Sequence, residues 1–553
     1  MLKNILAAFV LLSFSFALVP AQVAVPDQAR VVAGAERAWE KTIKAYVAPA
    51  PGCAVGVSLS GQSVFEKAFG LAEMEHGVPN TPQTIFESGS VAKQFTAAAL
   101  VLLQQDGKLN LDDPVRKYIT ELPDYGKPLT IRHLLNHTAG LRDWGSVMQL
   151  TGVGRGNRVV TQDIALDVIS HQKALDFTPG AEYSYSNSGY NLAAIIVERV
   201  SKQKFAAFTE ERLFKPLGMT KSSQRDDYQR IVPGRAQAYS RQGPTAPWIL
   251  NMPFMNVYGN GGMLTTVGDW LKWNAMLDSR SMGAPLVQAL ETQGVLNDGR
   301  KIPYALGLVV DKYNGMRDVS HGGSTAGYQT FLARYPDQKV SVAVLCNGTS
   351  PNASGLAAAI TDEIFGPAPP PAVQPESMEV APADLQKYAS LWRDEKTRNV
   401  VRTVFENGVL RLGNTPLRAL KDGSFQPGNG PVRVTFKFDK DGKPAFAERT
   451  IDGEITRVVA ESPWTPTADE LGSFAGDWYS EEAGATFTFG VEGGKAFLKQ
   501  RPTTSLPLTA LYKDHFSLPG YILWVTRDAS GKINKLHVGG SRMRDMPFER
   551  LKK

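Results

Sequence analysis

The chain has 553 residues, of which 43% are hydrophobic and 21% charged, a balance typical of a soluble globular protein with room for three or four domains. Its formal charge of +6 comes from 60 basic and 54 acidic residues without any block of five like charges, which argues against a nucleic-acid partner. Only two cysteines are present, so a disulfide scaffold and a cysteine-rich metal site are excluded.

The first segment, residues 1–21, is predicted to be a cleavable signal peptide. Lys3 provides a short positive region, residues 5–19 are almost continuously apolar, and Ala21 is a small residue at the expected cleavage site. The apolar run is shorter than a membrane span requires, and no later stretch reaches about 20 apolar residues. We therefore expect a periplasmic or secreted protein with no stable membrane anchor; the alternative is an uncleaved anchor.

Residues 31–365 alternate helix-like and strand-like patterns, which predicts one mixed domain. The segment 91–105 is apolar, rich in alanine and closed by Gly107, so it predicts a helix. β-Branched runs occur at 55–59 and 331–345. Strands near both ends of the domain, with helices between them, suggest a single sheet that is completed late in the chain.

A proline-rich linker is predicted at 366–382, because five prolines occur within ten residues at its start. Beyond it, short alternating runs predict two β units at 383–463 and 467–553. The two units form an internal repeat, since Leu385, Tyr388, Ala389 and Trp392 correspond to Leu471, Phe474, Ala475 and Trp478, and 416–420 to 507–511. Each unit has the size of a small eight-stranded antiparallel barrel. Chance similarity between two β-rich segments is the alternative.

Two short motifs in the first domain combine groups that can activate a nucleophile. In Ser90-Val-Ala-Lys93 the lysine lies three residues after the serine on a helix, so its amine can reach the hydroxyl and, once desolvated, act as its base. Tyr185-Ser-Asn187 adds a phenol for proton transfer and an amide that could hold the lysine or the substrate. Taken alone, each motif has a purely structural explanation, as a solvated helix face or a capped turn.

The third motif is His321-Gly-Gly-Ser324, which precedes a strand-like run. Its glycines would let a substrate approach a strand edge, and the Ser324 N–H could complete an oxyanion hole with the N–H of Ser90. A lone His-Gly-Gly is most often a simple turn. The motif gains weight only from the other two.

Together and in this order, the three motifs resemble those of the penicillin-recognising serine hydrolases, which include class C β-lactamases, DD-carboxypeptidases, D-aminopeptidases and related esterases. Segments 130–141 and 259–266 add to the likeness, which covers about 31–365. The resemblance implies an α+β fold: a β-lactamase-like domain with a five-stranded antiparallel sheet, helices and an all-helical region, followed by two small antiparallel β-barrel-like domains. The D-aminopeptidases of the group also carry two C-terminal barrels, one of which reaches into the active site.

The resemblance also implies roles for individual residues. Ser90 would be the nucleophile, and Lys93 and Tyr185 would move protons, without deciding which of the two is the acylation base. Four residues would bind the substrate: Asn187, His321, Gly323 and Ser324. No cofactor and no metal ion are implied.

One residue departs from much of the family. His321 stands where β-lactamases and most DD-peptidases carry a lysine, and a histidine is mostly neutral at pH 7. A substrate with a free carboxylate should therefore be held less well. We expect a small peptide, amide or ester as substrate, with D-aminopeptidase or D-amino-acid amidase and esterase activity ranked before carboxylesterase, DD-carboxypeptidase and β-lactamase activity.

The resemblance to this family also predicts where the two cysteines lie relative to each other. In this family the first strand lies antiparallel to the last, which brings Cys53 near Cys346. A disulfide in an oxidising compartment is our hypothesis. Two buried free thiols are the alternative.

Two other classes of function compete with the serine hydrolase. His133 and His137 have the i, i+4 spacing of zinc ligands, but Leu134 occupies the position of the catalytic glutamate of zinc peptidases. Penicillin-recognising domains also occur as non-catalytic sensors. The presence of all three motifs argues against a sensor that has lost catalysis.

Overall fold

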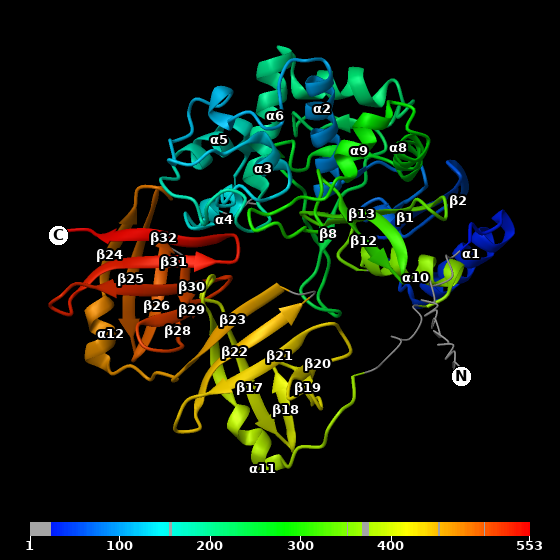
Figure 1. The fold of residues 1–553 in the computed structure, drawn as a ribbon. Coiled ribbons are helices and arrows are strands. Elements are labelled where there is room, and N and C mark those ends of the chain that lie inside the picture. Colours follow the sequence, from blue (N-terminus) through cyan, green and yellow to red (C-terminus); the bar gives the residue numbers. More distant parts are fainter. Residues whose placement is uncertain are drawn as a thin grey trace, which may run out of the picture.

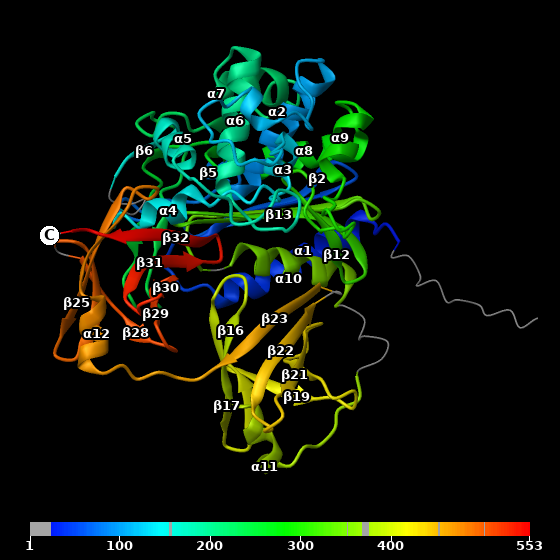
Figure 2. The same ribbon diagram turned by 60° about the vertical axis from the view of Figure 1, so that its left-hand side comes forward.

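The computed structural model describes residues 24–153, 158–350, 352–367, 375–451, 454–502 and 504–552. The predicted signal peptide and part of the predicted linker lie outside these residues. Figures 1 and 2 show a helix-rich first domain with two β units beneath it. Within the described ranges, no helix is both long enough and apolar enough to cross a bilayer.

An antiparallel sheet in the order β12-β13-β14-β15-β1-β2 frames the first domain. Its strands are β1 (Cys53–Leu59), β2 (Gln62–Phe69), β12 (Val309–Tyr313), β13 (Met316–Thr325), β14 (Tyr328–Tyr335) and β15 (Val340–Cys346). The sheet has six strands instead of the expected five. The additional strand β12 pairs with β13 through a tight turn at Asn314-Gly315, where both residues have the positive φ that suits such hairpins.

The first and last long strands of the domain are joined covalently. The register of β1 and β15 places Cys53 directly opposite Cys346, and the two sulfur atoms form a disulfide. The bridge hypothesised from the sequence is therefore present. It links two strands that are far apart in the sequence but are neighbours in the sheet.

Helices cover both faces of the sheet. On one face α1 (Gln28–Ala45) and α10 (Ala353–Phe365) pack together, and on the other lies α8 (Val267–Ser279). Successive strand residues serve opposite faces, so Val55 belongs to the core under α1 and α10 whereas Ala54 belongs to the core under α8.

The helical region is built around α2 (Lys93–Gln105). Its first eleven residues are all buried, as expected for a helix that is apolar on every side. The surrounding helices are α3 (Ile131–Leu135), α4 (Trp144–Gln149), α5 (Gln162–Ser170), α6 (Asn187–Ser201), α7 (Phe205–Thr209) and α9 (Ala284–Glu291). Short strands complete the domain: β3 (Leu71–Glu73), β4 (Val78–Pro79), β5 (Phe86–Glu87), β6 (Val160–Thr161), β7 (Ser223–Gln224), β8 (Tyr239–Ser240), β9 (Ile249–Leu250), β10 (Met255–Asn256) and β11 (Met263–Thr265).

The first β unit is a closed eight-stranded barrel that follows the short helix α11 (Pro382–Leu385). Its strands are β16 (Ser390–Asp394), β17 (Val400–Glu406), β18 (Val409–Leu412), β19 (Thr415–Ala419), β20 (Phe425–Pro427), β21 (Arg433–Phe438), β22 (Pro444–Ile451) and β23 (Glu454–Glu461). The repeated tryptophan Trp392 lies in β16 and is buried in the barrel core.

The second β unit follows α12 (Ala468–Phe474) and is a nearly closed nine-stranded barrel. Its strands are β24 (Gly476–Ser480), β25 (Ala485–Glu492), β26 (Lys495–Arg501), β27 (Thr504–Pro507), β28 (Thr509–Ala510), β29 (His515–Leu518), β30 (Tyr521–Arg527), β31 (Ile533–Gly540) and β32 (Met543–Arg550). Trp478 in β24 repeats the place of Trp392. The segment that matches β19 is divided into β27 and β28, which accounts for the ninth strand.

The second unit packs closely against the helical region. In Figures 1 and 2 the β31–β32 hairpin lies beside α4. Val147 and Leu150, at the end of α4 and just after it, belong to the hydrophobic core of this unit. The expected fold class, an α+β domain followed by two β-barrel-like domains, is confirmed.

Candidate active site

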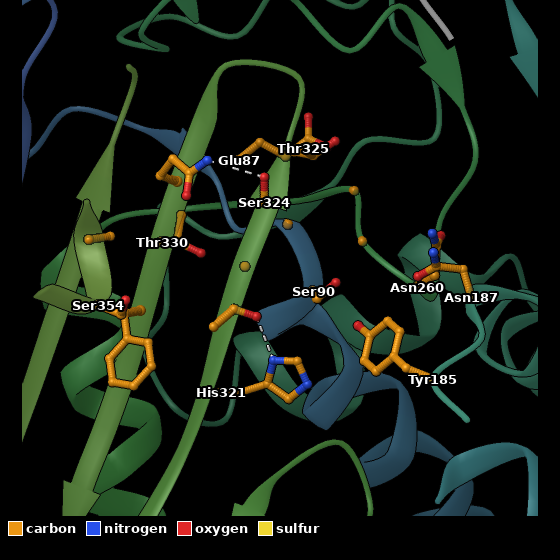
Figure 3. A pocket seen from close by; sticks show the side chains of 18 of the residues that line it. Glu87, Ser90, Tyr185, Asn187, Asn260, His321, Ser324, Thr325, Thr330 and Ser354 are labelled. Atoms are coloured by element: carbon orange, nitrogen blue, oxygen red, sulfur yellow. Dashed lines mark hydrogen bonds between the residues drawn. The ribbon is translucent and has the colours of Figure 1, made fainter. Parts of the chain in front are cut away.

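A cavity of about 580 Å³ opens between the helical region and β13. Six of the seven predicted site residues line it: Ser90, Tyr185, Asn187, His321, Gly323 and Ser324. The seventh, Lys93, contacts Ser90 directly. Three segments that are widely separated in the sequence therefore meet at one site (Figure 3).

Ser90 lies in a short 3₁₀ turn, η1 (Gly89–Ala92), that leads into α2. The helix thus begins slightly later than expected, but the spacing still brings Lys93 next to the serine. Lys93 Nζ donates to Ser90 Oγ at 3.0 Å, to Asn187 Oδ1 at 3.0 Å and to the Asn260 carbonyl at 2.6 Å. The lysine is 0% exposed, so its amine is desolvated and oriented by these acceptors.

Tyr185 lies on the other side of the nucleophile, with its hydroxyl directed towards Ser90 (Figure 3). Its ring centroid is 4.9 Å from Lys93 Nζ. Burial raises the pKa of Tyr185 well above its usual value of 10, and the neighbouring Ser90 hydroxyl and the Arg542 charge offset only part of that rise. The buried hydroxyl forms no hydrogen bond of ordinary geometry within the described residues. Tyr185 therefore retains its proton at neutral pH.

Strand β13 approaches the nucleophile's turn very closely. Thr330 Oγ1 on the neighbouring β14 donates to the Ser88 carbonyl at 2.7 Å. A Cβ atom on Gly323 would lie 2.1 Å from that same carbonyl oxygen, and one on Gly89, whose φ is +52°, would lie 2.6 Å from the Ser324 nitrogen. Glycine is required at both positions for the strand to reach the turn.

His321 is neutral and engaged within the protein. Its Nδ1 lies 2.6 Å from the Gly322 carbonyl, which can only accept, so Nδ1 carries the proton and Nε2 accepts from Tyr304 Oη at 2.9 Å. Burial lowers the pKa of His321 to about 4, with the charge of Lys93 adding to the effect. Both ring nitrogens have protein partners, so the side chain carries no positive charge towards the cavity at neutral pH.

Asp143 is a site residue that the sequence did not reveal. Its Oδ2 accepts from the Asn187 backbone N–H at 2.8 Å and from Asn187 Nδ2 at 2.9 Å. Its Oδ1 caps α4 by accepting from the N–H groups of Gly145 and Ser146. An aspartate before a helix is a recognisable cap signal, but nothing in the sequence indicates its contact with Asn187.

Asn191 and Arg542 complete the group of unexpected residues. Asn191 Nδ2 donates to Asn260 Oδ1 at 3.0 Å and so supports the residue whose carbonyl accepts from Lys93. Arg542, in the turn between β31 and β32, lines the cavity and places its guanidinium 4.9 Å from the centroid of the Tyr185 ring. The second β unit therefore contributes a charged side chain to the site.

Of the two histidines that suggested a zinc site, one lies in α3 and the other lies beyond its end. His133 belongs to the capping box of α3, where its Nδ1 accepts from the Thr130 N–H. His137 lies beyond the end of α3 at a φ of +58° and packs 4.1 Å from the Tyr185 ring. Because the second histidine is not on the helix, the helical i, i+4 pair of the zinc peptidases is not formed.

The fold, together with a buried lysine beside a serine, a facing tyrosine and a glycine-lined strand edge, defines a serine hydrolase of the penicillin-recognising type. The family model described as Beta-lactamase matches residues 39–364, and the chain belongs to this family. This identification agrees with the resemblance inferred from the motifs.

The likeness to a curated relative and to one of two solved structures extends beyond the first domain. A D-aminopeptidase from Brucella melitensis is 25% identical over 531 residues, covering 91% of this chain and 96% of that protein. The octameric penicillin-binding protein homologue from Pyrococcus abyssi has a TM-score of 0.53 at 21% identity, covering 86% of this chain and 99% of that one. A D-stereospecific amidohydrolase from Streptomyces sp. has a TM-score of 0.51 at 24% identity, covering 62% and 100%.

Proposed function

We propose that the protein hydrolyses amides or esters of D-amino acids through an acyl-enzyme on Ser90, as a D-aminopeptidase or D-amino-acid amidase or esterase. The observation that carries the proposal is the 3.0 Å hydrogen bond between Ser90 Oγ and the fully buried Lys93. A serine becomes nucleophilic when a neighbouring group can take its proton. The D-aminopeptidase relatives support the choice of substrate, because they match this chain over nearly its whole length.

In the acylation step, Ser90 Oγ attacks the substrate carbonyl and the bond to the leaving amine or alcohol breaks. Lys93 and Tyr185 carry the serine proton to the leaving group, and the protonated Tyr185 hydroxyl is directed for this transfer. The backbone N–H groups of Ser90 and Ser324 stabilise the oxyanion. Water then cleaves the ester, releasing the acid and restoring the serine.

The test is release of p-nitroaniline from D-alanine p-nitroanilide, with L-alanine p-nitroanilide and the Ser90→Ala variant as controls. We expect release from the D-isomer only and a loss of about 10³-fold or more in kcat for the variant. Equal rates for both isomers would overturn the stereochemical part of the proposal. Activity that survives Ser90→Ala would overturn the acyl-enzyme.

We also propose that the protein acts in the periplasm or outside the cell. The apolar segment near the N-terminus supports export, and the Cys53–Cys346 disulfide fits an oxidising compartment. Mass spectrometry of the protein recovered from its native location should find a chain that begins at Gln22. A full-length chain that remains in the cytosolic fraction would contradict the proposal.

A further inference from the structure

Among the described charged residues that line the active-site cavity, one cation has no carboxylate partner. Among the described lining residues, the only carboxylate is Glu87, which is fully buried and paired with Arg225 at 2.8 and 2.9 Å and with Arg235 at 3.3 Å. The Arg542 guanidinium has no carboxylate within ion-pair distance in the described parts of the chain, and its side chain is exposed. The cavity therefore presents a positive charge to an incoming substrate.

The backbone of the turn that carries Arg542 is fixed on both sides, so the fold determines where this side chain begins. The Arg542 carbonyl accepts from the Asp143 N–H at 2.9 Å. Two residues later, the Arg544 N–H donates to Asp176 Oδ1 at 3.0 Å, and Arg544 Nη2 donates to Glu182 at 2.9 Å. These backbone contacts fix the point from which the Arg542 side chain extends, and its guanidinium then lies over the Tyr185 ring.

The location of the charge indicates which part of the substrate it faces. Arg542 lies against the ring of Tyr185, the residue assigned to protonate the leaving group. His321 is neutral and cannot take the role that the family's lysine plays towards a carboxylate. We propose that Arg542, supplied by the second β unit, binds a free carboxylate on the leaving-group side of the substrate.

This inference rests on the proposed function and narrows it. The enzyme would favour a D-aminoacyl peptide whose leaving residue has a free α-carboxylate over a simple amide or anilide. Arginine binds carboxylates through two parallel N–H···O bonds, which gives selectivity for this group. The cavity offers no unpaired carboxylate, among its described residues, that would instead select a substrate by its ammonium group.

The experiment compares kcat/KM for D-alanyl-D-alanine with that for D-alanyl-D-alaninamide in the wild type and in Arg542→Gln. We expect the wild type to favour the carboxylate by about tenfold in kcat/KM, and the ratio of the two kcat/KM values to fall to about one in the variant. Arg542→Lys should retain part of the preference, and Arg542→Glu should reverse it. Arg501→Gln is the matched control, because Arg501 joins the same unit to the Thr151 carbonyl outside the cavity.

A second, achiral pair separates failure of this inference from failure of the proposed function. Both substrates are thioesters of benzoylglycine: one with thioglycolate, which has a free carboxylate, and one with methyl thioglycolate, which has none. Hydrolysis is measured by the release of the thiol. Ser90-dependent hydrolysis without any charge preference, or an equal loss on both thioesters in Arg542→Gln, would overturn the role of Arg542 alone. If no peptide, anilide or thioester is hydrolysed, the proposed function fails, and this inference fails with it.

Discussion

At the scale of single residues, the site depends on one chain of hydrogen bonds. Lys93 is oriented by Asn187, and Asn187 is in turn held by Asp143 through its backbone and side-chain N–H groups. An amide side chain has a donor and an acceptor end, and Asp143 fixes which end faces the lysine. Asp143 is thus a positioning residue, because it acts on the nucleophile through Asn187.

Asp143→Asn should therefore lower kcat by about 10²-fold, because an amide has only one acceptor oxygen. If that oxygen caps α4, the NH2 group faces the two Asn187 donors, and the lysine loses its fixed acceptor. Asparagine is as good a helix cap as aspartate, so α4 should remain intact. Steady-state kinetics on D-alanine p-nitroanilide should show the loss in kcat with KM nearly unchanged. A kcat equal to that of the wild type would contradict the positioning role.

The buried neutral histidine makes the stability of the protein depend on pH. His321 has a pKa of about 4 when folded and about 6.5 when unfolded, so between these values the unfolded chain binds a proton that the folded protein does not. The free energy of unfolding should consequently fall as pH drops from about 6.5 to 4, by about 3 kcal/mol from this residue. His137, whose pKa burial also lowers, acts in the same direction.

Denaturant unfolding of the wild type and His321→Gln at pH 7.5 and pH 4.5 should isolate this contribution. The glutamine variant should be the less stable of the two at pH 7.5, because the hydrogen bond from Tyr304 is disturbed, and the difference should shrink or change sign at pH 4.5. A difference that is the same at both pH values would show that His321 is not the titrating group.

At the scale of elements, the approach of β13 to η1 builds the site. The two consecutive glycines of β13 have different surroundings: a Cβ on Gly323 would collide with the Ser88 carbonyl, whereas one on Gly322 would lie 3.5 Å from the Phe331 ring, an ordinary contact. Only a side chain at position 323 would force the strand away from the nucleophile's turn.

We expect Gly323→Ala to lower kcat/KM by about 10²-fold and to reduce stability by about 1–3 kcal/mol, because the strand must shift to relieve the overlap. Gly322→Ala is the matched control and should cost less than about 1 kcal/mol with a small kinetic effect. The two variants can be compared by kinetics and thermal unfolding in parallel. Equal losses would mean that the close approach at position 323 is unimportant.

The motifs of the active site could be recognised in the sequence because each one is local. Ser90 and Lys93 lie on one turn, and Tyr185 and Asn187 lie at the start of α6, so the members of each pair are close in the sequence. The three motifs in their order then indicated the site. Asp143 was missed although a conspicuous segment, 130–141, ends just before it, since its partner lies on α6.

Contacts between distant segments explain the other differences. Arg542 lies in a turn of the second β unit, and no residue near it in the sequence indicates that this turn meets the cavity. The sixth strand of the sheet was also missed, although Asn314-Gly315 is a strong hairpin signal. The expectation that carboxylates are poorly held followed from His321 alone and did not include Arg542.

At the scale of the whole molecule, the second β unit is joined to the catalytic domain through a buried ion pair. Arg142 Nη1 donates to Glu482 at 2.6 Å, with the two side chains only 4% and 9% exposed. The next residue, Asp143, bonds to both Asn187 and the turn that carries Arg542. Docking of the β unit and the geometry of the nucleophile therefore share one short segment.

Removal of the buried acid should consequently disturb stability and catalysis together. Among the described residues, Glu482→Ala leaves the buried Arg142 with one carboxylate, the more distant Asp176 at 3.6 Å, and with the neutral acceptor Gln172; it should cost about 3 kcal/mol. Glu481→Ala is the matched control, since Glu481 pairs with Lys173 where both side chains are more than half exposed, and it should cost less than about 1 kcal/mol. Thermal unfolding, proteolysis of the second unit and kcat should all change for position 482 and not for 481. If Glu482→Ala releases the β unit to proteolysis while kcat stays at the wild-type value, docking and catalysis are independent, and the segment from Arg142 to Asp143 does not couple them.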